Sequence, residues 1–116
     1  MVRKKIPAKI IKNVNQYLTV LRRDKLPIKE AILFGSFAKG KQKKWSDIDI
    51  CIISPRFKNR SDAISYLWRK KHEMEKGNVS LNGHDLEPIG YNPKDFINED
   101  PLVWEIKNYG IRIGKK

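Results

Sequence analysis

The feature that most constrains this chain is a short apolar run that ends at a glycine and a serine. Residues 30–34 are almost entirely apolar, and Gly35 and Ser36 follow them directly. A short apolar run bounded by turn residues predicts a strand that is buried on both faces. Glycine permits a sharp turn, and a serine that opens a helical turn directs its N–H and hydroxyl toward an anion. The pair therefore predicts an anion-binding turn, although a glycine and a serine also occur together in ordinary turns.

A second predicted strand, residues 47–53, begins with two acids. Asp47 and Asp49 alternate with isoleucines, so both acids project from one face while the isoleucines bury the other. Side chains at i and i+2 of a strand lie about 6–7 Å apart along the chain. Two carboxylates that converge stay ionised together when a cation lies between them, and Mg²⁺ suits one or two carboxylates plus substrate phosphates. The alternative is a strand whose solvent-facing side is simply acidic.

A third acid is available on the strand predicted over residues 79–91. Asp85 and Glu87 again stand at i and i+2, and Pro88 follows at once. Two metal ions held about 3.5–4 Å apart need more than two carboxylate ligands. Either acid could reach the site from a neighbouring strand, and spacing alone does not choose between them.

The remaining segments are predicted to form the helices and the edge strand that support this site. Apolar residues at helical spacing predict a helix over residues 8–23 and another over residues 61–75, with Ser61 as the N-cap of the second. Asp100, Pro101 and Gly110 mark the two ends of a final helix. Residues 111–113 then form a short edge strand. This order of elements predicts an α/β (α+β) fold with a small mixed sheet flanked by helices.

Length and composition bound the possible functions. The 116 residues correspond to a single domain spanning 1–116, and one cysteine excludes an internal disulfide. Without an apolar run of about 20 residues or a signal peptide, we expect a cytoplasmic protein with no membrane partner. The formal net charge of +12 favours polyanionic partners such as nucleotides, nucleic acid or an acidic protein, or is simply a solubilising surface.

Taken together, these motifs resemble the polymerase-β-type nucleotidyltransferase superfamily. The signature comprises residues 35–40 and 45–49, with ten residues between Ser36 and Asp47. This interval is similar to that of the minimal nucleotidyltransferase (MNT) antitoxins of HEPN–MNT toxin–antitoxin pairs. Residues 85–91, 93–96, 100–102, 105–106 and 110–113 resemble a prokaryotic subfamily of such stand-alone domains. The resemblance implies the polymerase-β-like nucleotidyltransferase fold.

The resemblance also implies roles for individual residues. Gly35 and Ser36 would hold the β- and γ-phosphates of a nucleoside triphosphate, and Asp47 and Asp49 would bind Mg²⁺. Glu87, which precedes a proline as in the subfamily, would be the third metal-binding acid and would orient or deprotonate the acceptor hydroxyl, with Asp85 as the alternative. Lys39 would contact the triphosphate, together with Lys41, Lys43 and Lys44, and the alternative for each lysine is a solvated loop charge. Trp45 is a candidate for stacking on a base.

The implied reaction is transfer of a nucleoside monophosphate, AMP from ATP, to a hydroxyl with release of pyrophosphate. In the subfamily the acceptor is a protein, a HEPN-domain ribonuclease toxin that the modification silences. Since a minimal domain lacks an acceptor-binding domain, we expect a separate partner or a homo-oligomer to complete the site. Two other functions stay open: an antitoxin that acts by binding alone, and a transferase that modifies RNA, which the positive charge would attract.

Overall fold

The computed structural model describes residues 6–44, 46–76 and 85–113. Within these residues, four strands and four α-helices follow one another, with a short 3₁₀ helix before the last α-helix. In chain order they are α1 (Ala8–Arg23), β1 (Glu30–Phe34), α2 (Ser36–Lys39), β2 (Ile48–Ile53), α3 (Arg60–Lys76), β3 (Leu86–Tyr91), η1 (Pro93–Asp95), α4 (Pro101–Tyr109) and β4 (Ile111–Arg112).

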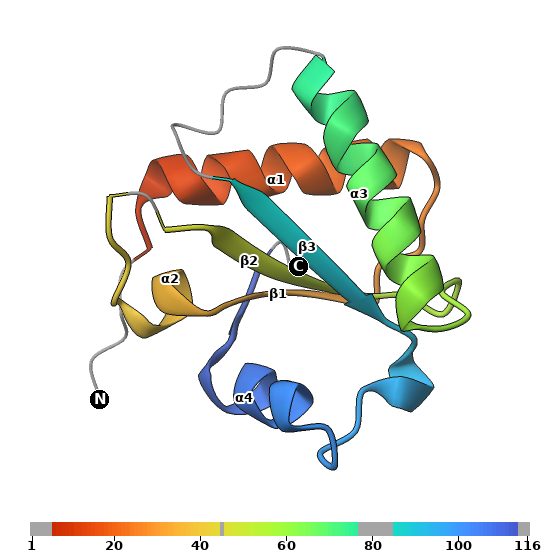
Figure 1. Cartoon of the computed structure of the whole chain (residues 1–116). Coiled ribbons are helices and arrows are strands. Elements are labelled where there is room, and N and C mark those ends of the chain that lie inside the picture. Colours follow the sequence, from red (N-terminus) through yellow and green to blue (C-terminus); the bar gives the residue numbers. More distant parts are fainter. Residues whose placement is uncertain (1–5, 45, 77–84, 114–116) are drawn as a thin grey trace.

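The strands form one mixed sheet in the order β3-β2-β1-β4. β1 pairs antiparallel with β2 on one side and with β4 on the other, whereas β2 and β3 are parallel. A parallel pair needs a crossover connection, and α3 lies on the chain between β2 and β3. The mixed sheet expected from the sequence is confirmed. Its topology brings the end of β1 and the starts of β2 and β3 to the same end of the sheet, beside α2 (Figure 1).

Helices cover both faces of this sheet. α1 and α3 lie on one face and α4 lies on the other (Figure 1). Side chains of a strand alternate between faces, so Ile48, Ile50 and Ile52 pack beneath α1 and α3, whereas Cys51 and Ile53 pack beneath α4. Asp49 has the same parity as Cys51 and therefore belongs to the α4 face.

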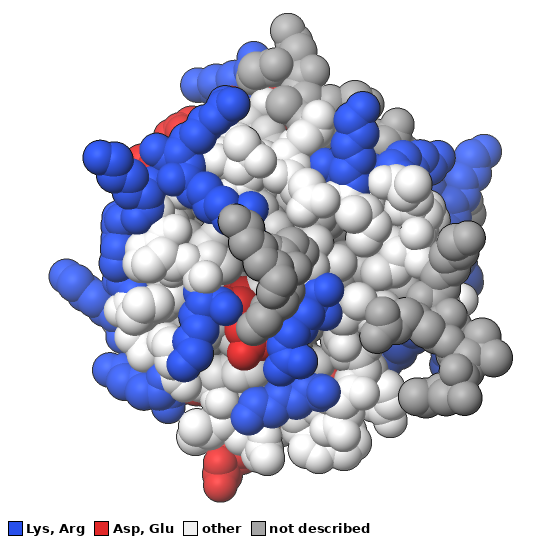
Figure 2. Space-filling model, turned by 180° about the vertical axis from the view of Figure 1, so that it is seen from behind, with Lys and Arg blue, Asp and Glu red and all other residues white. Residues whose placement is uncertain are grey.

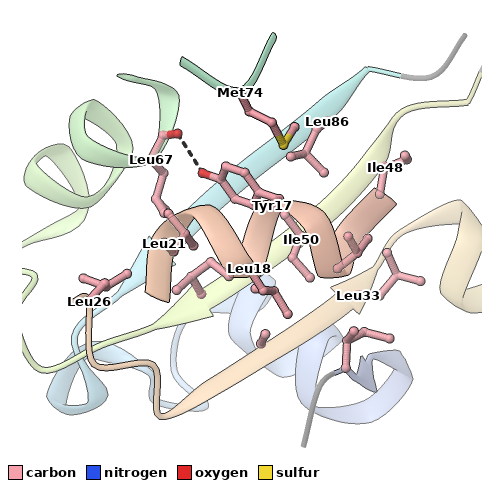
Figure 3. Close-up of a cluster of buried hydrophobic side chains, with 14 of the residues drawn as sticks. Tyr17, Leu18, Leu21, Leu26, Leu33, Ile48, Ile50, Leu67, Met74 and Leu86 are labelled. Carbon is pink, nitrogen blue, oxygen red and sulfur yellow. Dashed lines mark hydrogen bonds between the residues drawn. The ribbon is translucent and has the colours of Figure 1, made fainter. Parts of the chain in front are cut away.

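The larger core joins α1, α3 and the sheet. Tyr17 is fully buried there, and its hydroxyl donates a 2.7 Å hydrogen bond to the carbonyl oxygen of Leu67, which links the two helices (Figure 3). Burial raises the pKa of the Tyr17 phenol far above its usual range, so the hydroxyl keeps its proton and stays a donor. This core packs against one face of the sheet, so that polar residues such as Asp49 lie on the opposite face, which α4 covers.

Most of the predicted elements are confirmed, with small differences at their ends. β1 and α1 have the bounds that the sequence predicts, and α4 begins after Asp100, whose carboxylate accepts a hydrogen bond from Leu102 N–H at 2.9 Å. The third strand begins at Leu86 within the described residues, and the part of the prediction over 79–84 lies outside them.

The N-cap predicted for α3 is wrong. Asn59, not Ser61, caps this helix: its side-chain oxygen accepts from Asp62 N–H at 2.8 Å, and the Asp62 carboxylate accepts from Lys58 N–H at 2.9 Å. Asparagine and serine are comparable N-caps, so the pattern of residue types did not distinguish them. The helix consequently starts one residue earlier, at Arg60.

No helix among the described residues is both long and apolar enough to cross a bilayer.

Candidate active site

The Gly-Ser turn predicted from the sequence lies at the end of β1. Gly35 adopts φ +76°, in a region that L side chains rarely enter, and the chain turns there into the single helical turn of α2. Lys39 N–H donates to Gly35 O at 3.1 Å, and Lys41 N–H donates to Ser36 O at 2.9 Å. These bonds use the carbonyl groups of the turn. The N–H groups at the start of a helical turn have no partner within that helix, as anion binding requires.

Gly35 is also needed because of what lies against it. A Cβ atom at this position would collide with the Asp49 carboxylate, whose Cγ would lie 3.1 Å away. Phe34 pairs with Asp49 across the antiparallel β1–β2 ladder, which brings the turn and the acid together. The structure thus places the predicted phosphate-binding turn directly beside one of the two predicted metal-binding acids.

The parallel ladder brings the third acid to the same place. Asp49 on β2 and Glu87 on β3 are register partners, and both belong to the α4 face. Asp85 lies just before β3, is exposed, and accepts a backbone hydrogen bond from Ile48 N–H at 2.7 Å. The charges that act on Asp49 come from Glu87, Asp47 and Glu105. The register therefore favours Glu87 over Asp85 as the acid closest to Asp49.

This crowding of negative charge changes the acidity of Asp49. Partial burial is the largest cause, and the carboxylates of Glu87, Asp47 and Glu105 add to it, so the pKa of Asp49 rises to about 6. Within the described part of the chain, no lysine, arginine or histidine forms an ion pair with Asp47, Asp49 or Glu87. A cluster of carboxylates in this environment is a suitable binding site for a cation.

The acids fit Mg²⁺ as a partial ligand set. Among residues 6–44, 46–76 and 85–113, no three Asp, Glu, His or Cys side chains gather closely enough to form a complete metal cage. Mg²⁺ usually takes one or two carboxylates from a protein and completes its shell with water and substrate phosphates. The half-buried Asp49, with exposed Asp47 two residues earlier and the phosphate-binding turn against it, matches that incomplete donor set.

Glu105 on α4 is the site residue that sequence reasoning missed. It acts on Asp49 through its charge, and its carboxylate forms an ion pair of 3.4 Å with the Lys39 ammonium. Lys39 also lies 5.2 Å from the centre of the Tyr109 ring, one helical turn after Glu105. Nothing in the spacing of residues 35–49 points to α4. Glu105 can be recognised as a site residue only in the folded structure, where the pairing of β4 with β1 places α4 beside α2.

One further residue on the same face of the sheet takes no part in this cluster. Cys51 shares the face of Asp49 but is fully buried, and burial raises the pKa of its thiol to about 12, so it is a core residue. Trp45 lies outside the described residues. Among the loop lysines, Lys39 and Lys41 line a hollow of about 460 Å³ together with Ala38 and Tyr109. Of these two lysines, Lys39 reaches the acidic cluster through its ion pair with Glu105.

Positive charge is spread over the molecule. Lys and Arg side chains cover much of the face in Figure 2, with few acids among them. The formal net charge is +12, so the acidic cluster stands in a field that attracts anions. The combination of a local acidic site and a positive surround suits a substrate that is itself a polyanion and carries a metal ion.

Comparison with known proteins agrees with this geometry. The sequence profile of the nucleotidyltransferase domain matches residues 14–113. A protein of Methanocaldococcus jannaschii, named "Putative protein adenylyltransferase", is 31% identical over 78 residues, which are 67% of this chain and 75% of that protein.

Solved structures share the fold at low sequence identity. A nucleotidyltransferase from Sulfolobus solfataricus matches with a TM-score of 0.60 and 18% identity, over 90% of this chain and 79% of its own. A chain of a toxin–antitoxin structure with AMP-PNP gives 0.59 and 19%, over 88% and 73%. A chain from the complex of tri-AMPylated Shewanella oneidensis HEPN toxin with its MNT antitoxin gives 0.54 and 17%, over 90% and 71%.

Proposed function

This chain belongs to the nucleotidyltransferase domain family, and we propose that it transfers AMP from ATP to a hydroxyl group of a HEPN-type toxin, acting as the antitoxin of the pair. Membership makes it a nucleotidyltransferase. The nucleotide, the acceptor and the metal are parts of the proposal. The name of the M. jannaschii relative supports a protein acceptor, and the AMPylated HEPN toxin in the S. oneidensis complex supports the partner class.

The observation that carries the proposal is the meeting of three elements at one end of the sheet. Gly35 at the end of β1 lies against Asp49 on β2, and Asp49 lies beside Glu87 on β3. A phosphate-binding turn and neighbouring carboxylates are the parts that phosphoryl-group chemistry needs, because its catalysis rests on positioning and on charge neutralisation.

Each residue then has a role in the transfer. The turn at Gly35 and Ser36, with Lys39, binds the β- and γ-phosphates and so orients the α-phosphate. Asp47 and Asp49 would hold Mg²⁺, which would neutralise phosphate charge when bound. Glu87 accepts the proton of the acceptor hydroxyl. The hydroxyl oxygen forms a bond to the α-phosphorus as the bond to the β-phosphate oxygen breaks, and pyrophosphate leaves.

We take the acceptor hydroxyl to come from another molecule, the HEPN partner, as the AMPylated toxin of the S. oneidensis complex supports. A tyrosine of the HEPN partner is a suitable acceptor because its phenol is a good nucleophile once a carboxylate takes its proton. The AMP group would then block the toxin surface that carries it.

The positive surface supports RNA as a second acceptor class, and one experiment separates the possibilities. The protein is incubated with Mg²⁺, ATP labelled at the α-phosphate, its HEPN partner and a single-stranded RNA. The proposal predicts label on the partner and none for the Asp49→Asn variant. Label on RNA alone would favour the RNA-directed enzyme. Inhibition of the toxin by stoichiometric binding, with no label on either acceptor, would favour an antitoxin that acts by contact.

A further inference from the structure

Lys39 is held by α4 in this structure rather than directed at a ligand. Its ammonium lies 3.4 Å from the Glu105 carboxylate and 5.2 Å from the centre of the Tyr109 ring. Glu105 and Tyr109 are one turn apart, so α4 presents an anion and an aromatic face to the same cation. Lys39 is in turn the last residue of α2, the helical turn that begins at Ser36.

This contact can break without disturbing the fold. The Lys39 and Glu105 side chains are 34% and 39% exposed, and α2 is closed by its own backbone hydrogen bonds. A hollow of about 460 Å³ adjoins Lys39 and is lined also by Ala38, Lys41 and Tyr109. The ammonium therefore has space to turn away from Glu105 without repacking of the core.

Glu105 also stands close to the catalytic acids. Its charge acts on Asp49, which touches Gly35 of the phosphate-binding turn. A triphosphate bound at that turn would bring several anionic oxygens to the lysine that Glu105 now holds. Two anions would then compete for one cation, and their relative strength would decide where Lys39 points.

We propose that Glu105 is a positioning residue that holds Lys39 beside the phosphate-binding turn and releases it to the incoming nucleoside triphosphate. The inference rests on the proposed function, because it takes ATP as the ligand. Glu105 thereby lowers the affinity for nucleotide, since its contact with Lys39 must break before Lys39 can bind phosphate. It also keeps the ammonium near the turn in the nucleotide-free protein.

The expected effect is moderate. Exposed ion pairs contribute about 0.2–1 kcal/mol, so removal of the Glu105 charge should tighten nucleotide binding by a factor of about 1.4 to 5. The effect must act through Lys39. In a Lys39→Met background it should vanish, whereas a general loss of negative charge near the site would tighten binding in both backgrounds.

The test is a double-mutant cycle read by calorimetric titration. The ligand is the Mg²⁺ complex of α,β-methylene-ATP, which cannot transfer its AMP group, so binding is measured apart from catalysis and without the partner. The proteins are the unsubstituted chain, Glu105→Gln, Lys39→Met and the double variant. Glu99→Gln is the matched control, because Glu99 is an exposed acid on the loop before α4 and its change alters the net charge equally.

The proposal is supported if Glu105→Gln binds the analogue more tightly than the unsubstituted chain and Glu99→Gln binds it equally well. In the Lys39→Met background, Glu105→Gln should leave the affinity unchanged. Unchanged or weaker binding by Glu105→Gln alone overturns the proposal, and so does tightening that persists without Lys39. If the unsubstituted chain does not bind the analogue, both the choice of ATP and this inference are overturned. If it binds but Glu105 and Lys39 show no coupling, this inference alone is overturned.

Discussion

At the scale of single residues, Asp49 determines the chemistry of the site. It touches the phosphate-binding turn through Gly35, pairs in register with Glu87, and feels the charges of Asp47 and Glu105. The negative charges that favour a cation at this site also destabilise the folded, metal-free protein, because they repel the ionised carboxylate of Asp49.

Asp49→Asn should therefore stabilise the metal-free protein while it abolishes transfer. The folded pKa of Asp49 is about 6, above the value of about 4 in an unfolded chain. Ionisation is thus harder in the folded state, and stability from this group is lost as the pH rises from about 4 to about 6. We expect a gain of about 1 kcal/mol at neutral pH, after allowance for solvent screening of the roughly 3 kcal/mol that two pKa units represent.

The measurement is urea unfolding in EDTA at pH 4.5 and at pH 7.5. The gain should be present at the higher pH and shrink at the lower one. A variant that is equally or less stable than the unsubstituted chain at pH 7.5 would contradict the account of Asp49. Activity should fall by about 100-fold or more in the same variant, as for removal of a catalytic group.

Gly35→Ala should damage both fold and site. An alanine there must adopt φ +76° with ψ −151°, a region essentially restricted to glycine, at a cost of about 1–3 kcal/mol, and its Cβ must displace the Asp49 carboxylate. Gly40→Ala is the control, since Gly40 also has positive φ, at +71°, and ends the same helical turn. Thermal unfolding should show a smaller loss of stability for Gly40→Ala, because Gly40 is in the αL region that L residues can enter, and Mg²⁺-dependent nucleotide binding should be lost in Gly35→Ala alone. Equal loss in the two variants would mean that strain, not contact with Asp49, is what matters.

At the scale of elements, the register of β2 and β3 matters most. Spacing alone placed Asp47 with Asp49 and Asp85 with Glu87, but the choice between Asp85 and Glu87 depends on how one strand slides along the other. The parallel ladder sets Asp49 opposite Glu87. The alternation of apolar residues determines the face of the sheet on which each acid lies. Because Ile48, Ile50 and Ile52 are buried beneath α1 and α3, Asp49 must lie on the opposite face.

The sequence predicted the elements better than their mutual contacts. β1 was predictable because its residues are apolar and bounded by turn signals, and α4 because Asp100, Pro101 and Gly110 mark its ends. Glu105 was not predictable as a site residue, since its place beside Lys39 depends on how α4 packs on the sheet. The site assignments carried over from the family resemblance stay predictions, and the geometry supports their proximity.

The correction at the start of α3 gives a prediction at the element scale. Asn59→Ala removes the acceptor for Asp62 N–H and should cost about 1 kcal/mol in the free energy of unfolding. Ser61→Ala should change it by less than about 0.5 kcal/mol, because Ser61 is exposed and lies inside the helix. Chemical unfolding of the two alanine variants compares them directly. A larger loss from Ser61→Ala would restore serine as the cap.

At the scale of the whole molecule, the positive charge explains attraction but not specificity. With a net charge of +12, the protein should bind single-stranded RNA weakly and lose more than about tenfold in affinity between 50 and 200 mM salt. This binding should not lead to AMP transfer. Fluorescence anisotropy with a labelled RNA measures the first, and the labelled-ATP assay measures the second. Salt-insensitive RNA binding, or label on the RNA, would mean that the surface is a substrate site.

The most direct measurement compares Glu87→Gln with Asp85→Asn in AMP transfer to the HEPN partner under single-turnover conditions. The two substitutions remove one negative charge each from neighbouring positions, and the unsubstituted chain in the same assay sets the reference rate. We predict a rate lower by about 100-fold or more for Glu87→Gln and one within a few fold of the reference for Asp85→Asn. The reverse order, or no transfer by the unsubstituted chain, would contradict the site proposed around Asp49 and Glu87.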